Sequence, residues 1–493
     1  METARKTAGK APAAAAAAAN PNIRKYQQAN GWDVLEPSSE KVLAARAKRY
    51  LEFLSLCKTE RETLAYIEKA ARSDGFKPLA AEDKKSLKPG DRVFCISKNR
   101  AMALAVIGKR PAVEGFRIVA AHHDVPHLDL KSLPLYEKYG TALFKTHYYG
   151  GIKKFQWAAI PLSLHVFAVT KAGKTLRFAI GEKPGEPVFT ITDIAPHLAA
   201  KIQNDRKANE TLRGEELNIL VGHRPLPKKD KNAPASKGEE RVKGAVLEHL
   251  FTKYGLEEED LAWAEIEATP AFEAREVGFD ASMIGGFGHD DRACVMAAYE
   301  AIREIKIPEY TSIALLFDKE EIGSAGASGA QSMMISDIMN ILLHATSKSA
   351  DYSDLRRAIS NTYVLSGDTS VPIDPTFDGA FDPTNSGYLG NGVWICRFTG
   401  AGGKSGSSEA DIEFIARIRA LLGAEKIPYQ FGEMGKVDEG GGGTVAKFMA
   451  QMNMHVLDLC LPVLSLHSPF EILSKADYHH TIDAYRVFLS KKF

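Results

Sequence analysis

Acidic and histidine side chains stand at the ends of four apolar, strand-like runs of the sequence. The runs are FRIVAAHHD, TSIALLFDKEE, NTYVLSGD and LPVLSLHS, and they end respectively in His122, His123 and Asp124, in Glu320 and Glu321, in Asp368, and in His467. Any one of these residues alone is more often part of a solvated turn or a hydrogen-bonded core. The carboxyl ends of strands in open α/β sheets meet at one ligand-binding edge, so four runs that end alike predict one shared site.

A fifth segment contributes acidic residues from the start of a predicted helix. In GGFGHDDRACVMAAYEAI, His289, Asp290 and Asp291 precede apolar residues at helical spacing. An aspartate at this position can be a helix N-cap or a metal ligand. The N-cap would be favoured for Asp290 alone, whereas the other candidate residues favour a ligand.

The combined set of imidazoles and carboxylates fits a pair of divalent metal ions. Zinc-type ions accept both kinds of ligand, and two ions about 3.5 to 4 Å apart need a carboxylate that bridges them. No thiolate belongs to the set, which argues against a structural zinc site. The adjacent Glu320 and Glu321 would repel each other without a cation. When a cation is present, one carboxylate can bind it while the other accepts a proton from water.

The elements that must position these residues indicate an α/β fold with a mixed central sheet flanked by helices. Strand and helix patterns alternate in residues 21–130 and 241–493, which we expect to form one catalytic domain. Residues 131–240 contain short β-like pieces, many prolines and a lysine-rich loop, so we expect an inserted, mainly β domain there. Residues 1–20 are expected to be a disordered tail. The segment DYHHTIDAY, with His479 and His480, is expected to be a helix surface.

Composition excludes several classes of partner. Lys+Arg 63 against Asp+Glu 62 gives a net charge of +1, so no overall field favours nucleic acid or an anionic membrane. No apolar run approaches the roughly 18 residues that span a bilayer. The 5 cysteines form no C-x-x-C pair and are expected to be reduced thiols of a cytoplasmic protein.

Four segments together resemble a known peptidase family. AAHHDVPHLDLK, DDRACVMAAYEAI, LFDKEEIGS and LSLHSPFEILSKAD are similar, in this order, to motifs of the aspartyl aminopeptidase and vacuolar aminopeptidase I family. The resemblance extends from about residue 21 to the end and is strongest to the bacterial aminopeptidase I branch. It implies a zinc-peptidase fold, peptide substrates with a free N-terminus, and an inserted domain that pairs subunits of a homo-oligomer, dimers assembling to a dodecamer.

The resemblance also implies a role for each site residue. Two divalent ions are expected, Zn²⁺ by preference with Co²⁺ or Mn²⁺ as alternatives. Asp290 would bridge them, and the remaining ligands would be His122 and Asp368 on one ion and Glu321 and His467 on the other. Three further residues would complete the catalytic set: Glu320 as general base, Asp124 to orient His122, and His165 from AIPLSLHV, which would reach the site of a neighbouring subunit.

Some positions depart from the family pattern. His123, His127 and Asp291 replace a threonine, a small residue and an asparagine, and they could add charge or a ligand. The segment GDTSVPIDPTFDGAFDPTNSGYLGNG differs from the aspartyl-specific form, so a preference for acidic substrates does not follow. Two alternatives stay open: a related two-metal carboxypeptidase or N-acyl amino acid deacylase, and a non-catalytic assembly protein that retains metal-site residues.

Overall fold

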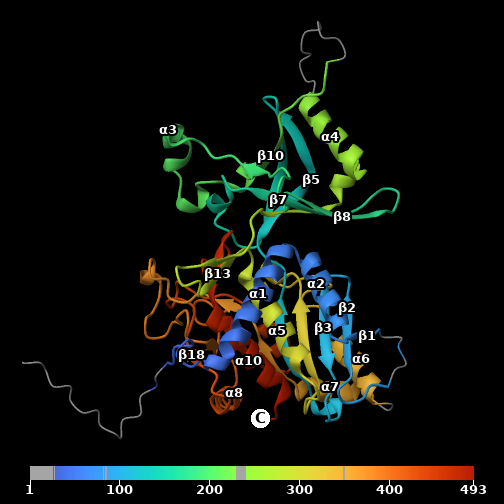
Figure 1. Cartoon of the computed structure of the whole chain (residues 1–493), viewed down its shortest axis with the longest axis vertical. Coiled ribbons are helices and arrows are strands. Elements are labelled where there is room, and N and C mark those ends of the chain that lie inside the picture. Colours follow the sequence, from blue (N-terminus) through green and yellow to red (C-terminus); the bar gives the residue numbers. More distant parts are fainter. Residues whose placement is uncertain (1–25, 27, 81–82, 84–85, 229–239, 348–349) are drawn as a thin grey trace, which may run out of the picture.

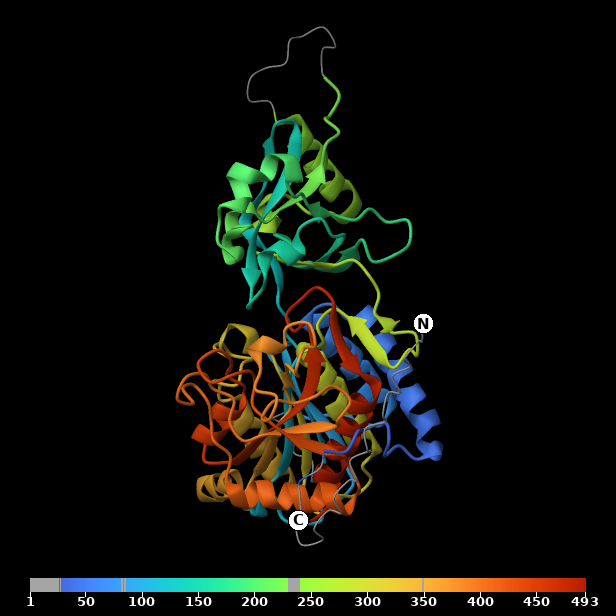
Figure 2. The same cartoon turned by 90° about the vertical axis from the view of Figure 1, so that its left-hand side faces the viewer.

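The chain folds into a larger and a smaller part, each built around its own sheet (Figure 1). The computed structural model describes residues 26, 28–80, 83, 86–228, 240–347 and 350–493. The tail predicted for residues 1–20 lies outside the described residues. Figure 2, turned by 90° from the view of Figure 1, shows that the smaller part lies against one end of the larger part.

A mixed sheet of thirteen described strands forms the centre of the larger part. Its main path runs in the order β1 (Lys77–Pro78), β2 (Arg92–Ser97), β3 (Ala101–Val106), β14 (Ser312–Phe317), β4 (Arg117–His122), β15 (Tyr363–Ser366), β19 (His455–Leu464), β20 (Glu471–Ser474), β13 (Met283–Gly286) and β12 (Arg275–Val277). Three further strands pair beside β19: β16 (Thr369–Ser370), β17 (Val393–Cys396) and β18 (Tyr429–Phe431).

The four central strands β14, β4, β15 and β19 run parallel to one another. Their register places Phe317 beside His122, and Ser366 beside both Ala120 and Asp458. β14 and β4 are buried along their whole length, as expected for apolar strands covered on both faces. The carboxyl ends of these strands therefore lie along one edge of the sheet, where the candidate site residues follow.

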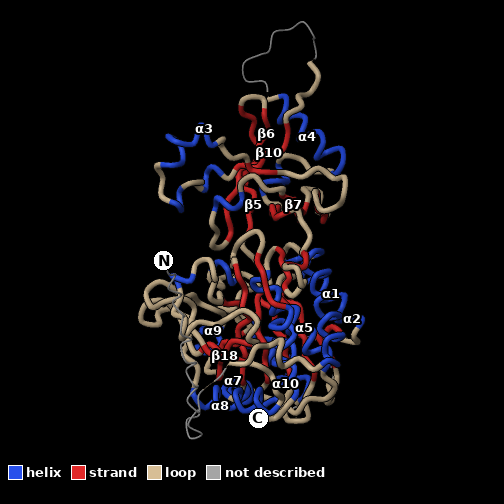
Figure 3. The backbone as a smooth tube through the Cα atoms, turned by 60° about the vertical axis from the view of Figure 1, so that its left-hand side comes forward, coloured by secondary structure: helices blue, strands red, loops and turns tan. Residues whose placement is uncertain are grey.

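Helices cover both faces of this sheet (Figure 3). Alternate side chains of β4 enter two buried clusters, Val119 and Ala121 on one face and Ile118 and Ala120 on the other. The first cluster contains side chains of α1 (Glu40–Leu56), α2 (Glu60–Ser73), α5 (His289–Glu304), α8 (Ile412–Ala424) and α10 (Lys475–Ser490). The second contains side chains of α6 (Met334–Thr346), α7 (Tyr352–Ser360) and α9 (Ala446–Gln451). This mixed sheet between helices agrees with the predicted fold class.

The smaller part is an antiparallel sheet of seven described strands with its own buried cluster. The strand order is β8 (Thr175–Ile180), β7 (Leu162–Val169), β11 (Glu265–Pro270), β5 (His127–Lys138), β6 (Thr141–Tyr149), β10 (Asn218–Gly222) and β9 (Thr190–Ile191). The helix α4 (Arg241–Tyr254) packs against β5, β6 and β10, and the short α3 (Pro196–Ala199) lies on the other side in Figure 1.

The boundaries of the smaller part differ from the sequence prediction of 131–240. Strand β5 already begins at His127, and β11 pairs between β7 and β5 although it lies beyond residue 260. The return of helix and strand alternation after residue 240 looked like the start of the larger part. That pattern carries no information about which sheet a strand joins. The sequence therefore predicts α4 and β11 in the larger part, whereas α4 packs on the smaller sheet and β11 pairs within it.

The two parts meet at the start of α2. This helix begins with a capping box, in which Thr59 Oγ1 accepts from the Glu62 N–H at 3.3 Å and Glu62 Oε2 accepts from the Thr59 N–H at 3.2 Å. The other oxygen of Glu62 lies 2.6 Å from Nδ1 of His165 in β7, and Arg61 forms an ion pair with Glu265 in β11. Among the described helices, none has the length and apolar character needed to cross a membrane.

Candidate metal centre

The carboxyl edge of the parallel strands brings the predicted ligands together. His122 ends β4, Glu320 and Glu321 lie in a short 3-10 helix after β14, Asp368 follows β15, and His467 follows β19. Asp290 comes from the start of α5. Two groups have ligand atoms within 4.8 Å of one another; they are His122, Asp290 and Glu321, and His122, Asp291 and Asp368.

Asp290 stands between the two histidines. Its Oδ1 lies 3.5 Å from Nε2 of His122, and its Oδ2 lies 3.1 Å from Nε2 of His467. The same His122 nitrogen is 3.7 Å from Asp368, and the same His467 nitrogen is 3.5 Å from Glu321. Each oxygen of Asp290 therefore faces a separate pair of ligands, which is the arrangement a bridging carboxylate requires.

Backbone carbonyls fix the tautomers of both histidines. His122 Nδ1 lies 3.0 Å from the carbonyl oxygen of Asp124, and His467 Nδ1 lies 2.7 Å from that of Gly151. A carbonyl oxygen can only accept, so each Nδ1 carries the proton. Each Nε2 then faces Asp290, and it is the nitrogen that would bind a metal ion once it has lost its proton.

Asp124 joins the two strand ends that carry the site. Its Oδ1 accepts from the Glu320 N–H and its Oδ2 from the Glu321 N–H, both at 3.1 Å, and its Oδ1 lies 3.4 Å from Nδ1 of His122. Burial alone would raise the pKa of Asp124, but the hydrogen bond and charge of His122 lower it to about 2. Asp124 thus orients His122 and the paired glutamates together.

Several buried carboxylates crowd this edge of the sheet, and the imidazoles of His122 and His467 face them. Burial raises the pKa of Glu320 to about 8, because neighbouring carboxylates outweigh the opposing effect of His122. Burial likewise raises the pKa of Glu321 well above its usual value. Oδ1 of Asp290, Oε1 of Glu321 and Oδ1 of Asp291 are buried and have no hydrogen-bond partner. Divalent cations would supply what these oxygens lack, so the residues present fit a metal centre.

Glu471 belongs to the site but was missed as a functional residue in the sequence. Its Oε1 accepts from the His467 N–H at 2.6 Å, and its Oε2 accepts from the Asp290 N–H at 3.1 Å. The carboxylate is 1% exposed. One side chain therefore holds the backbones of two candidate ligands that are 177 positions apart. Its position four residues after His467, in HSPFE, was the only available signal.

The three residues that depart from the family pattern, Asp291, His123 and His127, lie in different environments. Asp291 lies in the centre, since its Oδ2 accepts from the His122 N–H at 3.3 Å and its carboxylate is grouped with His122 and Asp368. His123 turns away, with Nδ1 3.1 Å from the carbonyl oxygen of Glu60. His127 lies 3.1 Å from a carboxylate oxygen of Asp129, away from the two ligand groups. Only Asp291 can therefore add charge directly at the ligands.

His165 lies outside the centre of its own chain. It is buried between Glu62, 2.6 Å from Nδ1, and Glu182, 3.0 Å from Nε2. Burial alone would lower the pKa of His165, but these two carboxylates raise it to about 9. Within the described part of the single chain this imidazole belongs to no candidate ligand group, and its predicted role in a neighbouring subunit stays a prediction.

A third group of metal-binding residue types, His479, His480 and Asp483, is not a metal site. Arg46 already supplies the positive charge: its Nη1 lies 3.2 Å from Nδ1 of His479 and donates to Asp483 at 3.2 Å. His480 Nε2 donates to the carbonyl oxygen of Gly31 at 2.9 Å. Both histidines are buried, so the expected helix surface was wrong; α1 and the segment before it cover this face of α10.

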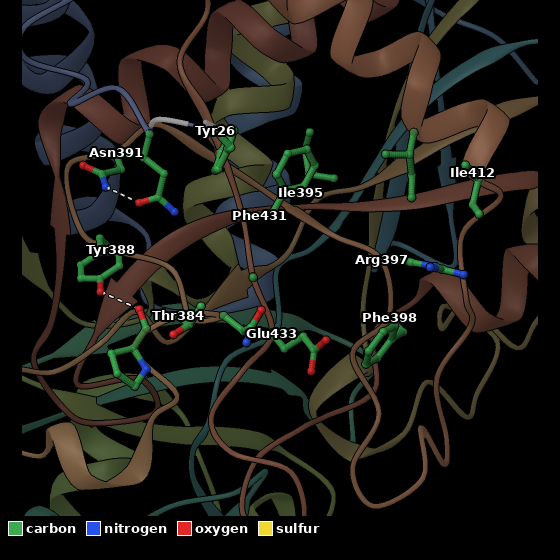
Figure 4. A pocket seen from close by; sticks show the side chains of 15 residues that line it. Tyr26, Thr384, Tyr388, Asn391, Ile395, Arg397, Phe398, Ile412, Phe431 and Glu433 are labelled. Atoms are coloured by element: carbon green, nitrogen blue, oxygen red, sulfur yellow. Dashed lines mark hydrogen bonds between the residues drawn. The ribbon is translucent and has the colours of Figure 1, made fainter. Parts of the chain in front are cut away.

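A cavity of about 980 Å³ lies away from the metal centre (Figure 4). Aromatic and aliphatic side chains line much of it, among them Tyr26, Phe431 and Ile412, together with Arg397 and Glu433. None of the candidate ligands lines it. The metal centre is therefore identified by its donor atoms rather than by the volume of a pocket.

Comparison with known proteins gives consistent matches over nearly the whole chain. Residues 53–489 match the family described as aminopeptidase I zinc metalloprotease (M18). A probable M18 family aminopeptidase 1 of Clostridium acetobutylicum is 41% identical over 482 residues, which cover 95% of this chain and 100% of that protein.

Solved structures show the same similarity in three dimensions. The crystal structure of an M18 family aminopeptidase from Thermotoga maritima superimposes with a TM-score of 0.89 at 39% identity, covering 95% of this chain and 100% of the other. A structure of the S. cerevisiae mApe1 dodecamer has a TM-score of 0.73 at 18% identity, covering 91% and 97%. The second likeness shows the fold alone.

Proposed function

Since the chain belongs to the aminopeptidase I zinc metalloprotease (M18) family, we propose that it removes N-terminal residues from peptides at the edge that carries Asp290. The motif resemblance in the sequence is thereby confirmed, and the chain is a metallo-aminopeptidase. The observation that carries the proposed site is the position of Asp290, with one oxygen toward His122 and the other toward His467.

Two divalent ions, zinc by preference, would be held by the residues of this edge. Asp290 would be shared, and the other ligands are assigned by proximity: His122 and Asp368 to one ion, Glu321 and His467 to the other. Asp291, beside His122 and Asp368, adds negative charge on the first side. The mixture of imidazole and carboxylate also tolerates Co²⁺ or Mn²⁺.

Glu320 is the proposed general base. When bound, the two ions would lower the pKa of a water molecule and polarise the scissile carbonyl. The Glu320 carboxylate would take a proton from the attacking water and return it to the leaving amine. Asp124 accepts from the Glu320 N–H and so holds the base beside the ligands. No described ion pair engages Glu320, because the adjacent Lys319 lies near Asp318 and Glu60 instead.

Assembly and location are parts of the same proposal. We assign the chain to a homo-oligomer, up to a dodecamer, in which His165 of one subunit reaches the centre of the next. S. cerevisiae mApe1 forms a dodecamer in its solved structure, and the shared fold supports this analogy. A cytoplasmic location is supported by five free, buried cysteines.

The test of the proposed function separates it from both alternatives. Zinc-loaded protein is assayed with aminoacyl anilides that have a free amino group and with their N-acetylated forms. We expect cleavage of the free substrates only, and Glu320→Gln should lower kcat by roughly 10²- to 10⁴-fold while keeping its metal. Glu321→Gln should instead lose metal.

Each alternative function predicts a different result in this assay. Cleavage of the acetylated substrates alone would identify a deacylase, and release of C-terminal residues would identify a carboxypeptidase. Equal, metal-independent inactivity of the wild type and Glu320→Gln would indicate a non-catalytic assembly protein. Glu273→Gln, an exposed glutamate outside the site, is the control for the substitution itself.

A further inference from the structure

The segment Tyr149–Gly150–Gly151, at the end of β6, contacts both sides of the candidate metal centre. It belongs to the smaller part, where Tyr149 pairs with His127 of β5. We propose that this segment is a positioning element of the centre, which fixes Asp124 through the Tyr149 hydroxyl and His467 through the Gly151 carbonyl. The inference rests on the proposed metal centre, and it gives the smaller part a role within its own chain's active site.

The Tyr149 hydroxyl completes the hydrogen bonding of Asp124. It donates to Asp124 Oδ2 at 2.8 Å, in addition to the two backbone N–H groups of Glu320 and Glu321. Asp124 is fully buried and therefore shielded from solvent, so each donor restricts the rotation of its carboxylate. Because this carboxylate also faces His122 Nδ1, the hydroxyl acts on a ligand through one intermediate residue.

The Tyr149 ring is itself held in place. The His127 imidazole stacks on it, with ring centres 4.6 Å apart and planes 15° from parallel. The Lys319 ammonium lies 5.4 Å from the same ring centre. Tyr149 is 8% exposed. These contacts give His127, a departure from the family pattern, a packing role beside the tyrosine rather than a ligand role.

The two glycines hold the opposite side of the centre. The Gly151 carbonyl accepts from His467 Nδ1 at 2.7 Å and so leaves Nε2 for the metal. Gly150 passes over Glu321 so closely that a Cβ added there would lie 3.2 Å from Glu321 Oε2 and 3.3 Å from Glu321 Cβ. Its φ of +70° also favours glycine. A side chain at this position would press on a candidate ligand.

The first test compares two neighbouring tyrosines. Tyr149→Phe removes only the hydroxyl that contacts Asp124, whereas Tyr148→Phe makes the same change at a position that is 39% exposed. Zinc affinity is measured by competition with a chromophoric chelator. We expect Tyr149→Phe to weaken binding of one ion by about 10- to 100-fold and to lower kcat with KM within about twofold. Tyr148→Phe should match the wild type.

A spectroscopic readout distinguishes positioning from general stability. In the Co²⁺-loaded protein, Tyr149→Phe should shift the visible absorption bands, which report the ligand geometry, while the unfolding temperature of the metal-free protein changes little. A lower unfolding temperature with unchanged bands and zinc affinity would show a merely structural role and overturn the proposal.

A second pair of variants tests the glycine side and does not depend on how Tyr149→Phe folds. Gly150→Ala and Gly140→Ala both place a Cβ at φ +70°, so they carry similar backbone strain. Only the methyl at 150 meets a ligand, since a Cβ at 140 has nothing within 4 Å. We expect Gly150→Ala to bind zinc about tenfold more weakly than Gly140→Ala.

Equal zinc affinity within both pairs would refute the positioning role, whatever the activity. The proposed function fails by a different result: a wild type that binds zinc but leaves free aminoacyl anilides intact. In that case the affinity comparisons still decide whether the segment positions the metal ligands.

Discussion

At the scale of single residues, two buried carboxylates outside the proposed ligand set hold the candidate ligands in place. Asp124 joins the glutamate pair to His122, and Glu471 joins His467 to Asp290. Each is buried and accepts from two backbone N–H groups: Asp124 from Glu320 and Glu321 after β14, and Glu471 from His467 after β19 and Asp290 at the start of α5. Such partners of ligands commonly change metal affinity or activity by about 10- to 100-fold when altered.

Glu471→Gln gives a prediction at this scale. The amide keeps the size of the side chain but has only one oxygen, so one of the N–H groups of His467 and Asp290 loses its acceptor. A buried donor left unpaired costs about 1 to 3 kcal/mol. We expect lower stability of that order and weaker zinc binding, measured by chemical unfolding and chelator competition. Unchanged zinc affinity would show that Glu471 serves stability alone. Glu273→Gln, at an exposed position outside the site, is the control.

At the scale of elements, the start of α5 is held by a buried arginine. Arg292 donates from Nε to the carbonyl oxygen of Gly288 at 3.1 Å, and from its two terminal nitrogens to the carbonyls of Cys57 and Phe287. The guanidinium is fully buried. It joins the loop before Asp290 to the end of α1, so a rigid element presents the proposed bridging ligand.

Arg292→Lys should therefore affect both stability and metal binding. An ammonium group lacks the planar fork that reaches three carbonyls from different directions. We expect a loss of about 2 to 4 kcal/mol in the free energy of unfolding, from buried carbonyls left without donors, and weaker zinc binding. Arg356→Lys, an exposed arginine of α7, is the control. Equal unfolding curves for the two variants would contradict this role.

Elements also show how far the sequence could predict the structure. Apolar runs that end in acids and histidines pointed to four candidate ligands and a helix start to the fifth, because strand period, strand ends and helix starts are local patterns. Glu471 and Tyr149 were missed as functional residues because their contacts join segments that are distant in sequence. The same limit hid the burial of His479 and His480 and the membership of β11 in the smaller sheet. Pairing between distant segments is a tertiary property without a local signal.

At the scale of the whole molecule, the metal-free chain carries an electrostatic penalty that depends on pH. Burial raises the pKa of Glu320 and of Glu471 to about 8. A raised carboxyl pKa leaves stability unaffected below about pH 4, where both states are protonated, and lowers it as pH rises toward 8. The carboxylates around His467 outweigh its burial and raise its pKa to about 10, and that contribution is lost between about pH 6.5 and 10.

These contributions have the same sign above pH 5, so they predict a single trend. The metal-free protein should unfold at progressively lower temperature as the pH rises from 7 to 9. Below this range the buried His289 and His479, whose pKa values burial lowers to about 3 and about 4, add stability with rising pH. Added Zn²⁺ should stabilise the protein more at pH 8 than at pH 5. Scanning calorimetry with and without a chelator measures both effects. Metal-free protein that grows more stable from pH 7 to 9 would contradict the assigned environment of the three groups.

The most direct test of the central claim is the number of metal ions bound per chain. Elemental analysis of protein loaded with Zn²⁺ and freed of excess should give two ions per chain for the wild type. In folded Asp290→Asn, which keeps the size of the side chain but loses its charge, both ions should be held less tightly, because Asp290 faces both histidines. One ion per wild-type chain, or an Asp290→Asn variant that keeps both ions at wild-type affinity, would contradict the claim that two ions share the Asp290 carboxylate.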